Sequence, residues 1–281
     1  MKNILLPTDF SENSLNAIEY ALEFFKGNSC NFYILNVQKS SDFLSADLVT
    51  AAPEASIYET IANDNKKQLK KLIKKYKLQF LHEAYTFKPI FDFDNLVNAI
   101  NETLASHKID LIIMGTNGTT NAREIVFGSN TIRVIRNIQC PVLIIPEKFK
   151  FSKIENILFS TFRSEDFSSA GISILKEIIA RHEPKVNVVE LNNNPITTSV
   201  KKDNARIKRL FKDINYKFSV VNRIPAAMVI STVVQLLHID LHAMFLDEKE
   251  SFLERFIFGS ERTKMSYGSS VPLLILHKLN S

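Results

Sequence analysis

The feature that most constrains the fold is an internal repeat that divides the chain into two halves. The segment KNILLPTDFSE at residues 2–12 matches ENILFSTFRSE at residues 155–165. In both, a short apolar run passes into a polar segment and then into a helical pattern. The ends of the halves match as well, because CPVLII at 140–145 resembles VPLLIL at 271–276. A repeat of this length predicts two similar units in tandem.

We assign the first unit to residues 1–148 and the second to residues 152–281, with the boundary near Lys148–Ser152. Strands are predicted at Asn3–Leu6, Asn31–Val37, Gln79–Thr86, Leu111–Met114 and Val142–Ile145, and in the second unit at Asn156–Ser160, Lys185–Leu191, Tyr216–Val221, Leu241–Leu246 and Val271–Leu276. Helices are predicted in the first unit at Glu12–Phe25, Ile57–Tyr76, Asp94–His107 and Asn130–Asn137. Strands separated by helices favour a parallel sheet covered on both faces. We therefore expect an α/β fold of two tandem, open, five-stranded parallel sheets of the Rossmann-like type, with a loop at Gln38–Pro53.

Composition and charge exclude several classes of protein. The only two cysteines, Cys30 and Cys140, are too few for a disulfide scaffold or a tetrahedral zinc site, and they fit a reducing cytoplasm. No apolar stretch is long enough for a membrane span. Residues 1–148 contain 16 basic and 16 acidic residues, so they have no concentrated positive charge for nucleic acid. The lysine-rich run at 66–77 has helical spacing, and we interpret it as the solvated face of a helix in preference to a nucleic-acid or membrane patch.

Three of the seven glycines fall within fourteen positions, after the fourth predicted strand. Residues 115–129 follow the pattern Gly-x2-Gly-x9-Gly-Ser, formed by Gly115, Gly118, Gly128 and Ser129. Glycine lets a phosphate approach the backbone closely, so that successive N–H groups can point at one anion. Ser129 stands at the start of a predicted helix, where it can cap the helix beside a second anion site. The carboxyl ends of parallel strands are also where open α/β sheets bind ligands.

Two better-known phosphate motifs are absent, since the chain contains neither the Gly-Lys-Ser/Thr of a Walker A loop nor a Gly-x-Gly-x-x-Gly fingerprint after its first strand. The alternative interpretation is that these glycines serve only tight turns and a helix start.

The repeat and the glycine pattern together resemble those of tandem members of the universal stress protein family. The resemblance covers nearly the whole chain and implies the adenine nucleotide alpha hydrolase-like form of the fold. It implies a site for ATP, ADP or AMP, in which Mg²⁺ or Mn²⁺ can accompany the phosphates. It implies adenine and ribose contacts from Pro7, Thr8, Asp9 and Val37. It implies phosphate and ribose contacts from Met114, Gly115, Gly118, Gly128, Ser129, Asn130 and Thr131. It also implies that the last strands of the two units pair within one chain.

Asp9 has two interpretations. Its carboxylate can accept hydrogen bonds from ribose hydroxyls, or it can serve as a turn or capping residue before the helix that begins near Ser11–Glu12. We favour the ligand role.

The second unit departs from the pattern. Aligning Ile109 with Ile239 places Phe245 opposite Gly115 and Glu248 opposite Gly118. The match of residues 2–12 with 155–165 places Ser160 opposite Pro7 and Phe162 opposite Asp9. Acidic residues at 247, 248 and 250 would repel a triphosphate. We therefore expect one nucleotide site per chain, in the first unit, and a degenerate site in the second.

Catalysis has little support in the sequence. No nucleophile stands beside a base in motif spacing, and no set of metal ligands is recognisable. The pair His238 and His242 straddles the predicted end of a helix and the start of a strand, so we interpret both as ordinary packing or surface residues. We expect a cytoplasmic stress-response module that binds a nucleotide and that can form a homodimer, without a nucleic-acid or membrane partner. The alternatives are a nucleotide-independent scaffold and a slow ATPase.

Overall fold

A computed structural model describes residues 1–38, 55–116, 127–162, 172–192, 207–246 and 270–277. Its strands are β1 (Lys2–Pro7), β2 (Cys30–Val37), β3 (Tyr85–Asp92), β4 (Leu111–Gly115), β5 (Val142–Ile145), β6 (Asn156–Phe162), β7 (Lys185–Asn192), β8 (Tyr216–Asn222), β9 (Leu241–Leu246) and β10 (Leu273–His277). Its helices are α1 (Glu12–Phe24), α3 (Ala55–Gln79), α4 (Leu96–Ser106), α5 (Ser129–Asn137), α6 (Ser173–His182) and α8 (Ala226–Leu236). The predicted loop at Gln38–Pro53 lies, apart from Gln38, outside the described residues.

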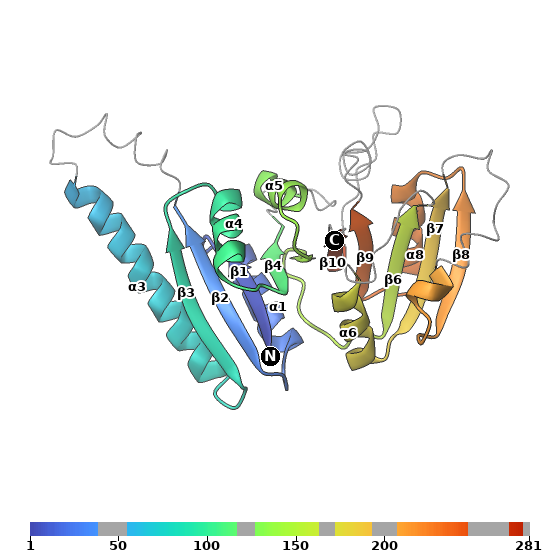
Figure 1. The fold of residues 1–281 in the computed structure, drawn as a ribbon, viewed down its shortest axis with the longest axis horizontal. Helices are drawn as coiled ribbons and strands as arrows, with labels where there is room; N and C mark the ends of the chain where they lie inside the picture. Colours follow the sequence, from blue (N-terminus) through green and yellow to red (C-terminus); the bar gives the residue numbers. More distant parts are fainter. Residues whose placement is uncertain (39–54, 117–126, 163–171, 193–206, 247–269, 278–281) are drawn as a thin grey trace.

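The strands form one ten-stranded sheet in the order β3-β2-β1-β4-β5-β10-β9-β6-β7-β8 (Figure 1). Each half contributes five parallel strands in the same relative order. The two halves meet where β5 pairs antiparallel with β10, with Leu143 opposite Leu274. The expected α/β class and parallel strand pairing are therefore confirmed, and the two predicted five-stranded sheets are joined edge to edge.

The hydrogen bonds at the amino ends of the strands repeat between the halves. Asp110 accepts a hydrogen bond from the backbone N–H of Asn3 at 2.8 Å, and Asp240 accepts one from the backbone N–H of Asn156 at 2.9 Å. The strand registers agree, because Ile4 lies opposite Leu111 as Ile157 lies opposite Leu241. The alignment made from sequence therefore corresponds to equivalent positions in the structure.

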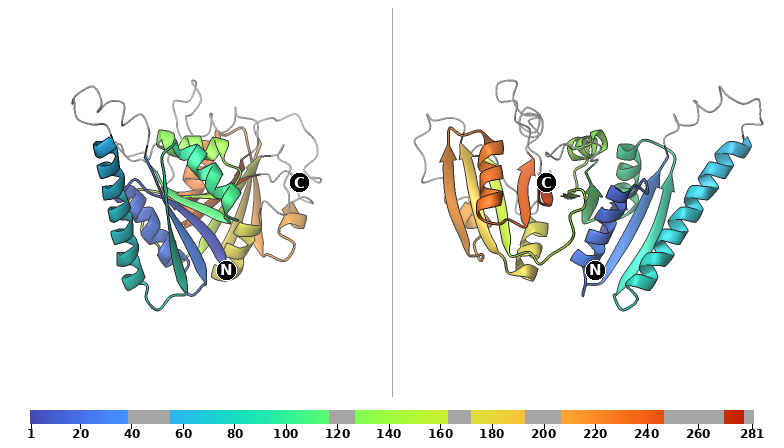
Figure 2. Two further views of the ribbon diagram at one scale, coloured as in Figure 1. Left: turned by 60° about the vertical axis from the view of Figure 1, so that its left-hand side comes forward. Right: turned by 180° about the vertical axis from the view of Figure 1, so that it is seen from behind.

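Helices cover both faces of the sheet, as the strand and helix alternation predicts. On one face α1, α3 and α6 bury residues such as Ile18, Tyr76 and Leu175 against the sheet. On the other face α4, α5 and α8 bury residues such as Ile100 and Val134. Figure 2 shows α3 running along the outer strands of the N-terminal half. None of the helices in the described part of the chain is long and apolar enough to cross a lipid bilayer.

The third strand was predicted too early, at Gln79–Thr86. The helix before it continues to Gln79, and β3 runs from Tyr85 to Asp92. Leucine, lysine and glutamine are good helix formers, which extend α3 beyond its predicted end at Tyr76. β3 is an edge strand and carries Lys88 and Pro89, which are typical of sheet edges but weaken a sequence-based strand prediction.

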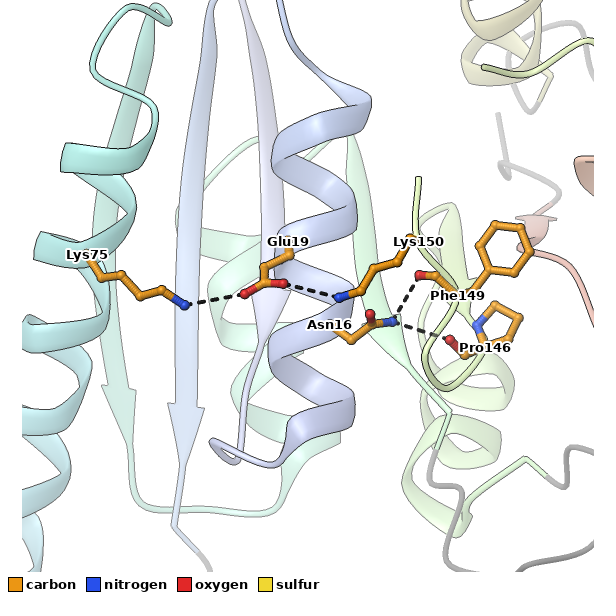
Figure 3. Close-up of polar contacts among 6 residues, drawn as sticks. All are labelled: Asn16, Glu19, Lys75, Pro146, Phe149 and Lys150. Atoms are coloured by element: carbon orange, nitrogen blue, oxygen red, sulfur yellow. Dashed lines mark hydrogen bonds and ion pairs between the residues drawn. The ribbon is translucent and has the colours of Figure 1, made fainter. Parts of the chain in front are cut away.

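The connection between the halves is fastened to α1 (Figure 3). The buried Asn16 side-chain amide donates hydrogen bonds to the carbonyl oxygens of Pro146, at 3.4 Å, and Phe149, at 3.1 Å. On the exposed side of the same helix, Glu19 pairs with Lys75 and with Lys150, each at 3.4 Å. The segment that follows β5 is therefore held to the first helix of the chain.

Candidate functional site

The carboxyl ends of β2, β1 and β4 lie next to one another, because these strands are parallel and adjacent in the sheet. They end at Val37, Pro7 and Gly115 respectively. We call this part of the sheet the carboxyl edge of the N-terminal half (Figure 1). It is the part where open α/β sheets bind ligands.

The segment after β1 is held by polar contacts around Thr8. The Thr8 backbone N–H donates to the Leu35 carbonyl at 2.8 Å, and the Asn36 side-chain amide donates to the Thr8 carbonyl at 2.8 Å. The buried Thr8 hydroxyl shares a hydrogen bond with the Ser14 hydroxyl at 2.9 Å and accepts one from the Phe10 backbone N–H at 3.0 Å. These contacts fix the path of the chain from β1 into α1.

Asp9 lies at the surface of this edge and forms a turn with Ser11. Its Oδ1 accepts hydrogen bonds from the Ser11 hydroxyl at 2.6 Å and from the Ser11 backbone N–H at 3.0 Å. Partial burial raises the pKa of the Asp9 carboxyl, but these hydrogen bonds lower it more, so that the pKa lies below its usual value. Ser11 is the N-cap of α1 and accepts from the Ser14 backbone N–H at 3.2 Å. Asp9 thus makes the turn that the alternative interpretation expected, with its charge retained at neutral pH.

The end of β4 is connected to the start of α5. The buried Thr131 hydroxyl in the first turns of α5 donates a hydrogen bond to the Gly115 carbonyl at 3.2 Å. On the other side, a Cβ atom at Gly115 would lie 2.8 Å from the backbone oxygen of Asn13 in α1. A glycine is therefore required at position 115 by the close approach of α1 alone.

The first turn of α5 differs in one respect from the prediction. Gly128 is the N-cap, and no side chain among the residues that the structure describes caps the helix, so the expectation that Ser129 caps α5 is wrong. Ser129 is instead the first residue of the helix and is exposed, and Asn130 follows it half-buried. The uncapped N–H groups of this turn remain available to an anion.

Three buried polar oxygens at or near this edge have no hydrogen-bond partner among the described residues. They are the Thr116 hydroxyl and the side-chain carbonyl oxygens of Asn13 and Asn36. Most buried polar groups in proteins are paired, so unpaired oxygens in one region are consistent with a polar ligand. Sequence reasoning missed these three residues, although Asn36 could have been noticed as a polar residue within the apolar strand FYILNV.

The structure brings most of the predicted site residues to the carboxyl edge. Pro7 and Met114 are buried near the ends of their strands, and Val37 is half-buried at the end of β2. Gly118 lies outside the described residues.

The corresponding edge of the C-terminal half has different chemistry. Ser160 occupies the position equivalent to Pro7, and its hydroxyl shares a hydrogen bond with Nε2 of His242 at 2.7 Å. Both side chains are fully buried, and burial lowers the pKa of His242 to about 3. His238 is exposed after the end of α8, so the two histidines straddle a helix and a strand as expected. Within the described ranges, no group of three or more His, Cys, Asp or Glu side chains could hold a metal ion.

Fold and site together define an α/β protein with a doubly covered parallel sheet and a polar, glycine-containing edge at the carboxyl ends of its N-terminal strands. The sequence profile of the Universal stress protein family matches residues 1–146. The chain therefore belongs to the universal stress protein family.

Individual relatives agree with this assignment. Universal stress protein MJ0531 of Methanocaldococcus jannaschii is 32% identical over 151 residues, which is 53% of this chain and 84% of the relative. Universal stress protein MJ0577 of the same organism is 29% identical over 155 residues, or 52% of this chain and 96% of the relative. A solved structure of a universal stress protein from Archaeoglobus fulgidus DSM 4304 covers 99% of this chain and 98% of its own, with a TM-score of 0.70 and 18% identity. That last similarity shows that the fold is shared over the full length.

Proposed function

We propose that residues 1–148 bind ATP or a related adenine nucleotide at the carboxyl edge, and that the chain acts as a cytoplasmic binding or signalling module of the stress response. The observation that carries the proposal is the hydrogen bond from Thr131 to the carbonyl of Gly115, which holds the uncapped start of α5 against the end of β4. A helix N-terminus in this position favours an anion such as a phosphate. The Gly-x2-Gly-x9-Gly-Ser spacing supports the same assignment.

The other residues fit the remaining parts of a nucleotide. Val37, half-buried at the end of β2, offers apolar surface for an adenine ring next to the end of β1. The ionised Asp9 carboxylate can accept hydrogen bonds from ribose hydroxyls. A Mg²⁺ or Mn²⁺ ion bound with the phosphates would neutralise their charge and needs few protein ligands.

The C-terminal half is proposed to lack a second site. Phe245, buried in β9, stands at the position equivalent to Gly115, so a bulky side chain replaces the first glycine of the Gly-x2-Gly pattern there. In this proposal the C-terminal half has a structural or regulatory role.

A nucleotide-independent scaffold is the second candidate, and two observations favour it. Gly115 is already explained by the close approach of Asn13, and the Asp9 carboxylate is already engaged by Ser11. On this interpretation Gly115 and Asp9 stabilise the fold and do not bind a ligand.

Replacement of Gly118 by valine separates the two candidates, because Gly118 belongs to the Gly-x2-Gly-x9-Gly-Ser pattern. Gly115 is less suitable, since α1 already requires a glycine there. Calorimetric titration with ATP and Mg²⁺ is expected to show binding to the wild type and at least tenfold weaker binding to Gly118→Val. The matched control is Glu248→Val, the same change at the equivalent position of the second half, which should leave affinity unchanged.

No binding to either protein would favour the scaffold, whereas equal affinity for wild type and Gly118→Val would remove the glycine pattern from the proposed site. Phosphate release above background that disappears in Gly118→Val would instead identify a slow ATPase.

A further inference from the structure

The outward face of α3 carries a dense group of positive charges. Residues 65–82 contain seven lysines and no aspartate or glutamate. Leu69, Ile73 and Tyr76 pack on the sheet, and all seven lysines are exposed on the remaining surface of the helix. Figures 1 and 2 show α3 at one end of the molecule, beside the edge strand β3. The positive charge is therefore gathered on an outer surface of the N-terminal half.

Most of these lysines have no negative partner. Lys67 pairs with Asp64 at 3.3 Å, and Lys75 pairs with Glu19 at 3.4 Å. In the part of the chain that the structure describes, four others that share one side of the helix form no ion pair. They are Lys70, Lys71, Lys74 and Lys77, and we call them the lysine face. Like charges one helical turn apart repel, so this arrangement weakens the helix unless an anion lies against it.

Two large apolar side chains border the lysine face. Leu78 is 66% exposed and follows Lys74 and Lys71 by four and seven residues, so it lies on the same side of α3. Leu81, just after the end of the helix, is 69% exposed. A single exposed leucine is common on protein surfaces, whereas two beside a lysine cluster combine charge with apolar area. The surface therefore suits a partner that is anionic and also has an apolar layer.

We propose that the lysine face, together with Leu78 and Leu81, binds the surface of a membrane that contains anionic phospholipids. Groups of four or more lysines on an amphipathic helix are typical of proteins that bind acidic lipid headgroups. The long lysine stems let the ammonium groups lie at the level of the headgroup phosphates while the leucines enter the boundary of the acyl chains. The contact is peripheral and does not involve the carboxyl edge, so the inference is independent of the proposed nucleotide site.

The proposal revises the interpretation of the lysine-rich run as a solvated face alone. The helical spacing of the run predicts that its lysines are exposed. It does not predict that Leu78 and Leu81 are exposed beside them, or that the four lysines of the lysine face form no ion pair within the described residues. These two structural observations are what favour a partner over water.

Charge and side-chain type favour a membrane over other anionic partners. Residues 65–82 contain no arginine for bidentate contacts with nucleic acid, and no exposed phenylalanine, tyrosine or tryptophan on which bases could stack. An acidic protein segment offers negative charge alone. A bilayer with anionic headgroups offers negative charge over apolar chains, which matches lysines and leucines on one face.

The first test measures cosedimentation of the full chain with lipid vesicles. Binding is expected to vesicles of phosphatidylglycerol mixed with phosphatidylcholine, but not to phosphatidylcholine alone, and it should weaken as salt is added. The double variant Lys70→Gln with Lys74→Gln is expected to bind at least fivefold more weakly. The matched control is Lys212→Gln with Lys217→Gln, which removes the same charge from exposed lysines of the C-terminal half and should bind as the wild type does.

The contribution of the leucines is tested separately. Leu78→Ser is expected to weaken binding to phosphatidylglycerol vesicles at least twofold, whereas Leu236→Ser, at another exposed leucine (72%), should leave it unchanged. All the substituted side chains are exposed, so the melting temperatures of the variants should match that of the wild type. No binding of the wild type to phosphatidylglycerol vesicles, or equal binding of the lysine variant and its control, would overturn the proposal.

A second measurement distinguishes a bilayer from a soluble polyanion. The two native cysteines are buried, so Leu78→Cys supplies one accessible thiol for an environment-sensitive fluorophore. The emission is expected to shift to the blue with phosphatidylglycerol vesicles and not with polyglutamate, whereas the same label on Leu236→Cys should show no shift. No shift of the Leu78→Cys label with vesicles contradicts the proposal, and a shift with polyglutamate instead would make an acidic protein segment the better occupant.

Discussion

At the residue scale, the buried pair Ser160 and His242 gives the molecule a definite response to acid. Burial lowers the pKa of His242 to about 3, whereas an unfolded histidine titrates near 6.5. The neutral side chain therefore stabilises the fold above about pH 6.5. This stabilisation is lost as the pH falls below 6.5 towards 3, because the unfolded state takes up the proton first.

The prediction uses His242→Ile, since isoleucine is the equivalent residue, Ile112, in the first half. Urea unfolding between pH 7 and pH 4 should show that the stability of the wild type relative to the variant falls by up to about 1.4 kcal/mol per pH unit below pH 6. A parallel pH dependence in the two proteins would show that His242 does not titrate in this way.

Asp9 titrates in a lower range. Hydrogen bonds from Ser11 hold the pKa of its carboxyl below the ordinary value of 3.8, so the stabilising effect of the carboxylate is present above about pH 4 and is lost as the pH falls through the folded-state pKa. Asp9→Asn should therefore lower stability slightly at pH 6, and the difference from the wild type should shrink as the pH falls below about 4, as measured by thermal unfolding. The same variant should weaken ATP binding at pH 7, and unchanged affinity would remove Asp9 from the proposed site.

Some residues of the candidate site could be predicted from the sequence, and some of their contacts could not. The positions of Thr8, Asp9 and Thr131 at the carboxyl edge were predictable, because a strand end and a helix start both have sequence signals. The contact between Gly115 and Asn13 was not predictable, because it depends on how closely α1 approaches β4. The Thr116 hydroxyl, which has no hydrogen-bond partner in the described part of the chain, was not predictable either, because burial and pairing depend on the folded structure.

At the scale of elements, α1 connects the candidate site with the link between the halves. Its N-terminal end carries the turn made by Asp9 and Ser11, and its middle holds Pro146 and Phe149 through Asn16 (Figure 3). Buried and exposed contacts of this helix should differ in energy, since a buried unpaired carbonyl costs more than a broken ion pair in water.

Asn16→Ala removes the buried amide and should destabilise the protein by about 1–3 kcal/mol in urea unfolding, because two carbonyl oxygens lose their donor. Glu19→Gln, three residues further along the same helix, breaks two exposed ion pairs and should cost less than about 1 kcal/mol. Equal costs for the two variants would show that Asn16 does not hold the link in the way described here.

Element boundaries were predictable where a cap or a glycine marks them and unreliable where neither does. α1 begins after Ser11, as its sequence indicates, and ends within one residue of the prediction. β3 was misplaced because residues 79–84 are apolar enough to suggest a strand, while the strand itself contains Lys88 and Pro89.

At the scale of the whole molecule, the repeat predicted two similar five-stranded units, and the pairing of β5 with β10 agrees with what the family resemblance implied. The repeat alone does not explain why the two halves carry different residues at equivalent positions. The N-terminal half has Gly115, Pro7 and Ile112 where the C-terminal half has Phe245, Ser160 and His242. The central claim is therefore an asymmetric molecule with one nucleotide site per chain.

Stoichiometry tests this claim most directly. Nucleotide that copurifies with the full chain would be identified by mass spectrometry, and the nucleotide-free protein would then be titrated calorimetrically with ATP and Mg²⁺. We expect the titration to show one ATP bound per chain. Two ATP per chain would contradict the assignment of a degenerate second half, and no binding would contradict the nucleotide site itself.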